Sequence, residues 1–163
     1  MTTIEKGGAD KINWSIAVVI IIGTFMAILD GTIVNVSLPK MMAVFGVPAN
    51  QIQWVATAYM LALGVVMPMT GYLGDRYGYK RMYLFALGMF TLGSALCGAS
   101  WNLASMVVAR VIQAVGGGIM QPLGMAIIYQ NYPRSRMGTV LGVWGISTMA
   151  APAIGPTLGG YLV

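Results

Sequence analysis

The chain has 163 residues, of which 58% are hydrophobic and only 8% are charged. So few charged side chains cannot solvate the surface of a soluble domain of this size, so a soluble globular protein is excluded. The formal net charge of +5 is not gathered into a basic face, which argues against nucleic-acid binding.

Five long apolar runs follow one another along the chain. Each is long enough to cross a hydrocarbon core about 30 Å thick as a helix, and none shows the alternation of a membrane β-strand. The first is too long for a secretory signal and lacks a convincing small-residue cleavage site. We therefore expect an all-α membrane protein with a tail at 1–12 and spans at residues 13–38, 52–74, 82–100, 103–130 and 137–163.

The basic residues predict how the chain is oriented in the membrane. One group of short segments, the tail and the loops after the second and fourth spans, holds seven of the nine Lys and Arg residues. The loops on the other side hold only Lys40. The N-terminus is therefore expected to be cytoplasmic in a multi-pass protein of the cell membrane. The seven residues are Lys6, Lys11, Arg76, Lys80, Arg81, Arg134 and Arg136.

Two ionisable residues lie inside predicted spans, Asp30 in the first and Arg110 in the fourth. Such residues cost about 2.5–3.5 kcal/mol each at a helix centre, so they usually face a cavity or a partner. A rise of about 1.5 Å per residue places Asp30 about 25 Å and Arg110 about 20 Å above the cytoplasmic side. The alternative is that both snorkel to the outer interface. The nearby polar residues Thr32, Asn35 and Gln113 favour the cavity.

Proline and glycine are frequent inside the spans. Prolines at four such positions favour kinks, and dense glycines, in one consecutive run and in two pairs at small-xxx-small spacing, favour close helix packing. Broken, glycine-rich helices of this kind often mark transporter sites. The prolines are Pro68, Pro122, Pro152 and Pro156, and the glycines are Gly116–Gly118, the pair Gly138/Gly142 and the pair Gly155/Gly159.

Residues that carry catalysis or bind metals are scarce. The chain has no histidine and one cysteine, Cys97, which reads as an inert small residue in an apolar helix. Without histidine or a second buried carboxylate there is no acid–base pair and no common zinc site. We therefore expect neither an enzyme, nor a metal site, nor a cofactor.

Five motifs, in this order and spacing, resemble the major facilitator superfamily. They are similar above all to the fourteen-helix drug:proton antiporters, the EmrB/QacA-type multidrug efflux permeases. One departure is Tyr79, where many relatives carry a basic residue. The motifs are Leu29-Asp-Gly-Thr-Ile-Val-Asn-Val-Ser-Leu-Pro39, Gln53-Trp-Val-Ala-Thr-Ala-Tyr59, the 2–3 loop from Gly71 to Arg81, Arg110-Val-Ile-Gln-Ala-Val-Gly116, and Ala151-Pro-Ala-Ile-Gly-Pro-Thr-Leu-Gly-Gly160.

The resemblance implies that the five helices form most of the N-terminal six-helix bundle of a major facilitator fold. It implies proton-coupled efflux of amphiphilic drugs or toxic compounds, with lipid bilayer, protons and a small amphiphilic substrate as partners. Proton coupling or substrate contact would fall to Asp30, Asn35, Arg110 and Gln113. A cytoplasmic gate would comprise Gly71, Asp75, Arg76, Gly78, Lys80 and Arg81, and an antiporter motif would comprise Gly155, Pro156, Gly159 and Gly160.

Other functions stay open at this point. A major facilitator that carries a nutrient or metabolite, or a non-transporting membrane interaction subunit, fits the same spans. Five spans are one short of two three-helix repeats, and alternating access needs a second bundle. We therefore expect the chain to be the N-terminal fragment of a longer transporter, with the missing C-terminal helices as its partner and with no transport of its own.

Overall fold

The computed structural model describes residues 14–162. The predicted tail, with Lys6 and Lys11, lies outside the described residues, as does Val163. The helices are α1 (Trp14–Phe45), α2 (Ala49–Ile52), α3 (Trp54–Tyr77), α4 (Tyr79–Gly98), α5 (Leu103–Asn131) and α6 (Arg134–Leu162). In the part of the chain that the structure describes, five segments are long and apolar enough to cross a membrane, with α2 and α3 forming one of them. The prediction of an all-α membrane protein is confirmed.

Helix α1 extends beyond the predicted span, through Pro39 to Phe45. It ends at Gly46, which has a φ of 64°, a left-handed conformation that glycine adopts without strain. The extra turns are stabilised because Met42 and Phe45 pack on a cluster of buried residues from the next helices, Ile52, Val55 and Met106. A limit set by bilayer thickness alone therefore ends this helix too early.

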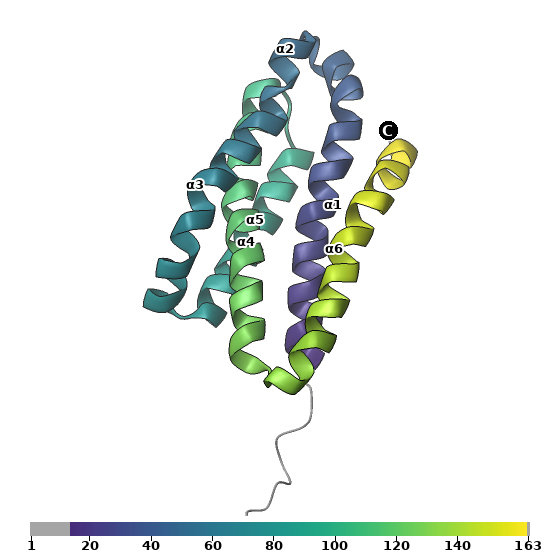
Figure 1. Cartoon of the computed structure of the whole chain (residues 1–163). Helices are drawn as coiled ribbons and strands as arrows, with labels where there is room; N and C mark the ends of the chain where they lie inside the picture. Colours follow the sequence, from purple (N-terminus) through teal and green to yellow (C-terminus); the bar gives the residue numbers. More distant parts are fainter. Residues whose placement is uncertain (1–13, 163) are drawn as a thin grey trace, which may run out of the picture.

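The other connections are short and chemically explained. A single residue, Gly78, joins α3 to α4 with a φ of 87°. Before α5, the side chain of Asn102 accepts a hydrogen bond from the backbone N–H of Ser105 at 2.7 Å, while the Ser105 hydroxyl faces the Asn102 N–H. This reciprocal capping satisfies free N–H groups at the helix start. Short connections of this kind force consecutive helices to run antiparallel (Figure 1).

Helix α5 lies at the centre of the bundle. It packs closely on α3 and α4 and also touches α1, whereas α6 packs almost entirely on α1 (Figure 1). The main core joins Ile20 of α1, Ala86 and Phe90 of α4, and Met120 and Leu123 of α5. The ionisable residues Asp30 and Arg110 lie within this bundle.

The glycines predicted to mediate close packing do so only in part. A Cβ at Gly116 would collide with the backbone of Ala86 and Phe90, so α4 and α5 touch backbone to backbone there. For Gly138 and Gly142 the prediction is wrong, because a Cβ at either would meet nothing within 4 Å. Their spacing is right for packing, but no helix of the described part covers that side of α6.

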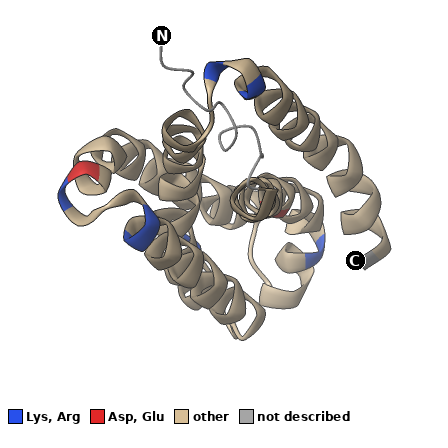
Figure 2. Ribbon diagram, turned by 90° about the horizontal axis from the view of Figure 1, so that it is seen from below, with Lys and Arg blue, Asp and Glu red and all other residues tan. Residues whose placement is uncertain are grey.

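Charged residues lie mainly on the turns at one end of the bundle. Seen from below, Lys and Arg mark the α3–α4 turn and the start of α6 (Figure 2). Lys40 lies in the last turns of α1, toward the opposite end. This distribution is the one expected if each end of the bundle faces a different aqueous compartment.

Candidate functional site

The two ionisable residues predicted to lie at similar depth inside the membrane form an ion pair. Arg110 Nη1 lies 2.5 Å from Asp30 Oδ2, which links α5 to α1. The Arg110 side chain is only 2% exposed, whereas 24% of Asp30 is exposed. The structure therefore agrees with the cavity interpretation of these residues and not with snorkelling to an interface.

Gln113 ties the ion pair to a third helix. Its Oε1 accepts a hydrogen bond from Arg110 Nη1. Its amide nitrogen donates to Asp30 Oδ1 at 3.0 Å and to the Ser94 hydroxyl of α4 at 2.6 Å. Both protons of the amide are thus used, and the carboxylate is held on both oxygens. The Cys97 thiol lies 3.8 Å from the same Oε1, so Cys97 adjoins this network.

Tyr59 of α3 completes the surroundings of Arg110. Its ring lies under the guanidinium, with Arg110 Cζ 4.3 Å from the ring centroid, and it is only 7% exposed. A cation over an aromatic face is attracted by the ring's negative quadrupole, and more strongly where water is excluded. The Arg110 Nε has no hydrogen-bond partner among the described residues.

Glycines allow four helices to converge on this small polar cluster. A Cβ at Gly93 of α4 would lie 2.5 Å from the backbone of Gln113. One at Gly117 of α5 would lie 2.8 Å from the Tyr59 hydroxyl. Any larger residue at these points would push Ser94 or Tyr59 away from the ion pair. The close approach of backbones therefore positions the hydrogen-bonding groups.

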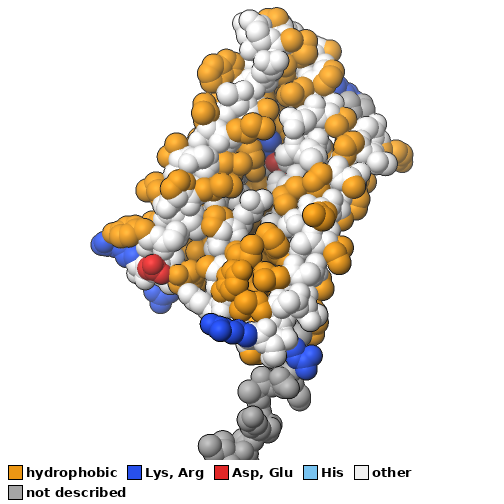
Figure 3. Space-filling view, in the orientation of Figure 1, with side chains coloured by type: hydrophobic (Ala, Val, Ile, Leu, Met, Phe, Trp, Pro, Cys, Tyr) orange, Lys and Arg blue, Asp and Glu red, His pale blue; other side chains and the backbone are white. Residues whose placement is uncertain are grey.

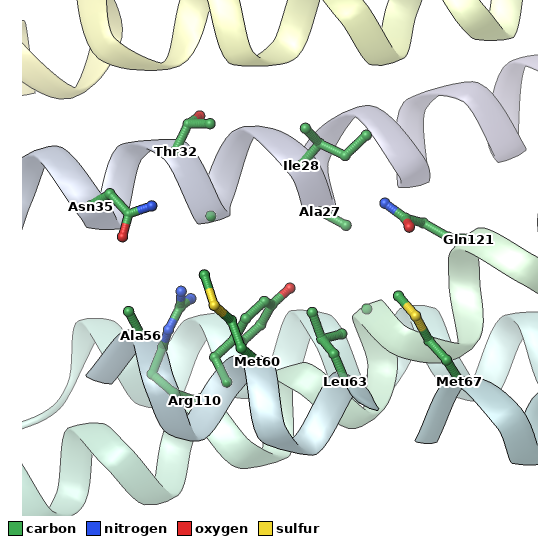
Figure 4. A pocket seen from close by; sticks show the side chains of 13 residues that line it. Ala27, Ile28, Thr32, Asn35, Ala56, Met60, Leu63, Met67, Arg110 and Gln121 are labelled. Carbon is green, nitrogen blue, oxygen red and sulfur yellow. The ribbon is translucent and has the colours of Figure 1, made fainter. Parts of the chain in front are cut away.

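A cavity of about 250 Å³ opens beside the cluster, between α1, α3 and α5. In Figure 4, Asn35 projects from α1 toward the cavity and Arg110 and Gln121 lie across from it, whereas the Thr32 side chain points toward α6. Most of the remaining lining is apolar and includes Met60. A mainly apolar cavity with a few polar groups suits a small molecule that has both apolar and polar surface.

A second cavity, of about 710 Å³, continues from the first toward the start of α6. The two share Ile28, Met67 and Gln121, and the second ends among aromatic side chains that include Tyr129 and Trp144. Figure 3 shows the corresponding groove, with acidic and basic atoms visible at its bottom between apolar walls. The ion pair is therefore reachable from the surface of the bundle.

The residues predicted to form a gate lie elsewhere, on the α3–α4 turn. Arg76 donates to the Tyr72 hydroxyl at 2.7 Å, and Asp75 accepts a hydrogen bond of 2.6 Å from Tyr79. Tyr79, the departure from the family pattern, thus holds the acidic residue of the motif. The remaining members, Gly71, Gly78, Lys80 and Arg81, are exposed.

The antiporter motif divides between two sides of α6. Gly155 and Gly159 are buried against α1, where a Cβ would press on Thr32 and on Ile33, respectively. Pro156 and Gly160 are exposed. Only half of the motif therefore forms the contact with α1 in this structure.

Two residues of the cluster were not assigned a role from the sequence. Tyr59 lies in one of the recognised motifs, so its position there was a usable signal. Ser94 is one of several serines and threonines in apolar helices, and others, such as Thr91, bond their own helix backbone. Nothing in its sequence context separates it from them. Among residues 14–162 no group of three His, Cys, Asp or Glu side chains is placed to hold a metal ion.

Comparison with known proteins gives the family. The sequence model described as Major Facilitator Superfamily matches residues 20–163. The chain is 44% identical to the uncharacterized MFS-type transporter YhcA of Bacillus subtilis, over 91% of the chain and 28% of the relative. It is 38% identical to the riboflavin transporter RibZ of Clostridioides difficile, over 94% of the chain and 34% of the relative.

A third relative, the multidrug export protein EmrB of Haemophilus influenzae, is 36% identical over 86% of the chain and 28% of its own length. The chain thus spans about a third or less of the curated relatives that it matches. Together with the five long apolar helices, the family match confirms the predicted fold class.

Proposed function

The chain belongs to the major facilitator superfamily, and from that premise we propose that it contributes the N-terminal helices of a proton-coupled exporter of small amphiphilic compounds. The observation that carries the proposal is the Asp30–Arg110 pair, bridged by Gln113 and lying beside a mainly apolar cavity. Relatives described as multidrug proteins support export as the direction.

The cluster has the chemistry that proton coupling needs. When Asp30 is ionised, Arg110 and Gln113 both donate to it, and the guanidinium is held toward α1. Protonation of the carboxyl removes the negative charge that balances Arg110. The Arg110 side chain, which is 2% exposed, is then a buried unpaired charge, so its guanidinium has to bond another acceptor or turn into the cavity. A proton on Asp30 is thereby converted into a change of charge at the cavity wall.

The same carboxylate can receive a cationic substrate. A positively charged amphiphile in the cavity would compete with Arg110 for Asp30, while its apolar part lies against side chains such as Met60 and Leu63. Methionine is flexible and polarisable, which suits ligands of varied shape. Substrate and proton would then exclude each other at one site, as antiport requires.

A second candidate is transport of a specific metabolite. It is favoured by the similarity to a riboflavin transporter, which is as extensive as that to the multidrug proteins. The aromatic lining of the larger cavity, from Tyr129 and Trp144, suits a flat heterocycle equally well. Competition between riboflavin and a dye in one transport assay separates the two candidates.

The test of proton coupling uses a chimaera that joins this chain to the remaining helices of a long relative. In everted membrane vesicles, the chimaera is expected to move ethidium in a manner that a protonophore abolishes. Asp30→Asn is expected to abolish this movement while leaving membrane insertion intact. The matched control is Asp10→Asn, the same chemical change in the predicted N-terminal tail, which should leave ethidium movement in place. Normal proton-dependent transport by Asp30→Asn would remove this residue from the mechanism.

We also propose that the N-terminus is cytoplasmic, as the basic residues favour. Single cysteines placed at Lys40 and at Arg134, in a Cys97→Ala background, test this in intact cells. A membrane-impermeant maleimide is expected to label position 40 and not position 134, with permeabilised cells as the control in which both react. Labelling of position 134 alone would reverse the topology.

A further inference from the structure

A third cavity lies on the far side of α5 from the ion pair. It occupies about 410 Å³ between α3 and α4, which both pack on α5 but make few contacts with each other. Its lining residues on α5, Val115 and Ile119, alternate along the helix with Gly117 and Gln121 of the first cavity. A step of two residues turns by about 200° around the axis of an α-helix, so Val115 and Ile119 lie on the opposite side of α5 from Gly117 and Gln121. The two cavities are therefore separate sites.

The walls of this third cavity are formed by apolar side chains and one tyrosine ring, that of Tyr77. On α3, Met69, Leu73 and Tyr77 follow one another at four-residue spacing, so they form a continuous stripe along the helix axis. On α4, Met82 and Phe85 face them. A groove of this kind, running along the membrane normal between two helices, has the shape of an extended hydrocarbon chain.

Cations stand at the end of the groove where the membrane surface lies. Lys80 and Arg81 occupy the short stretch between the lining residues Tyr77 and Met82. Arg81 precedes Phe85 by one helical turn, so it projects from the same face of α4. On the other wall, the Arg76 guanidinium lies 5.8 Å from the centroid of the Tyr77 ring.

The charges at this end are not balanced locally. Against three basic residues the turn carries one acidic residue, Asp75, whose carboxylate accepts from the Tyr79 hydroxyl. Lys80 and Arg81 are exposed, and Arg76 is steadied by Tyr72 and Tyr77. In Figure 3 the charged atoms at this corner adjoin an apolar surface.

From this juxtaposition we propose that the α3–α4 groove binds an anionic glycerophospholipid. One acyl chain lies along the stripe of α3, and the phosphate lies among Arg76, Lys80 and Arg81. Guanidinium and ammonium groups form charge-assisted hydrogen bonds to phosphate, and each basic residue adds attraction to an anionic head group. A zwitterionic choline head group would bring a further cation to a site that already has an excess of them. The site is distinct from the proposed transport site and does not depend on it.

The test compares two lipids that share acyl chains, dioleoylphosphatidylglycerol and dioleoylphosphatidylcholine, by native mass spectrometry of the purified chain in detergent. Phosphatidylglycerol is expected to bind at least about fivefold more tightly, the factor that one favourable basic contact supplies. Replacing all three cations, with Arg76→Gln, Lys80→Gln and Arg81→Gln, is expected to bring the ratio close to one. Equal affinity for both lipids in the unmodified chain would overturn the proposal.

The matched control removes the same number of charges elsewhere, with Lys40→Gln, Arg134→Gln and Arg136→Gln, and should keep the preference. An equal loss in both triple variants would mean general electrostatic attraction and would also overturn the site. The groove is tested separately with Met69→Trp, which fills its wall and should weaken phosphatidylglycerol binding by about fivefold or more, with all cations intact. Met60→Trp, on the same helix but in the first cavity, should not. If Met69→Trp binds as tightly as the unmodified chain, the acyl chain does not use this groove.

Discussion

Helices α5 and α6 have the same length, 29 residues each, and both are apolar enough to cross a membrane. Over the most hydrophobic part of each, 56% of the residues of α5 are buried inside the bundle, against 11% of those of α6. Helix α5 is packed by α3, α4 and α1, whereas α6 packs mainly on α1 and touches α5 only slightly. Two helices of similar length and hydropathy therefore differ in how far they are buried by the rest of the bundle.

The difference follows from polar residues and not from hydrophobicity. In a bilayer an apolar side chain gains little by choosing protein over lipid, so packing is set by groups that lipid cannot accommodate. Helix α5 carries Arg110 and Gln113, which require partners, and α1 and α4 supply them. Helix α6 has no charged residue after Arg136 as far as Leu162. Its contacts are formed by small and apolar residues, with Gly155 and Gly159 lying against α1 and Val140 buried in the main core.

The largest expected effect comes from removing the charge that holds α5 in the bundle. Arg110→Ala leaves Asp30 without its cation and should lower the free energy of unfolding by about 3 kcal/mol, the lower end for a broken buried pair because Asp30 is partly exposed. Unfolding in mixed micelles, followed by circular dichroism, measures it.

The control on α6 is Ile146→Ala, an exposed apolar residue, with an expected change within about 0.5 kcal/mol. Adding Asp30→Asn to Arg110→Ala should recover at least about 1 kcal/mol, since the pair is coupled. A double variant no more stable than Arg110→Ala would show that the guanidinium stabilises the bundle through Tyr59 and Gln113 and not through Asp30.

The next effect separates the glycines of the two helices. In Gly116→Ala the added methyl group collides with the backbone of α4, and the free energy of unfolding should fall by about 1–3 kcal/mol. Gly142→Ala, in open space on α6, should leave stability unchanged or raise it by up to about 1 kcal/mol, because alanine is the better helix former. The same unfolding measurement serves both. Equal losses would mean that α6 is packed as tightly as α5, and the comparison would fail.

A smaller effect is expected at the contact that holds α6. Gly155→Ala presses on Thr32, whose hydroxyl donates to Leu29 O at 2.7 Å, and the threonine has to turn away. A loss of about 1 kcal/mol should appear as faster amide hydrogen exchange in α6, with α3 to α5 unaffected. Gly160→Ala, whose Cβ would meet nothing, is the control. Unchanged exchange in α6 would show that the helix is held by something other than this contact.

The smallest effect tests Ser94. Ser94→Ala removes one of the two acceptors of the Gln113 amide nitrogen and should cost about 0.5–1.5 kcal/mol, as for one buried hydrogen bond. Ser147→Ala on α6 removes a hydroxyl that bonds only its own helix, at Val143 O, and should change stability very little. If the two serines prove equivalent, Ser94 has no part in positioning Gln113.

The sequence predicts the membrane class, the number of long helices and the similar depth of Asp30 and Arg110, because an isolated charge in an apolar run strongly restricts where it can lie. It does not distinguish Gly116 from Gly142, since a glycine pattern describes one helix and a helix contact needs two. Ser94 is hidden for the same reason, as its role depends on Gln113 of another helix. The extension of α1 to Phe45 depends on packing with Ile52, which membrane thickness does not encode.

The single-residue joint at Gly78 has a mechanical consequence. A connection of one residue offers only two soft torsions, so it provides almost no slack between the ends of α3 and α4. The joint between α1 and α2, at Gly46 to Pro48, is three residues long and can absorb more displacement. The adjoining ends of helices α3 and α4 therefore have to move together. A tilt of α3 at the α3–α4 turn is carried into α4, and so toward Gly93 and Ser94, where α4 bears on Gln113.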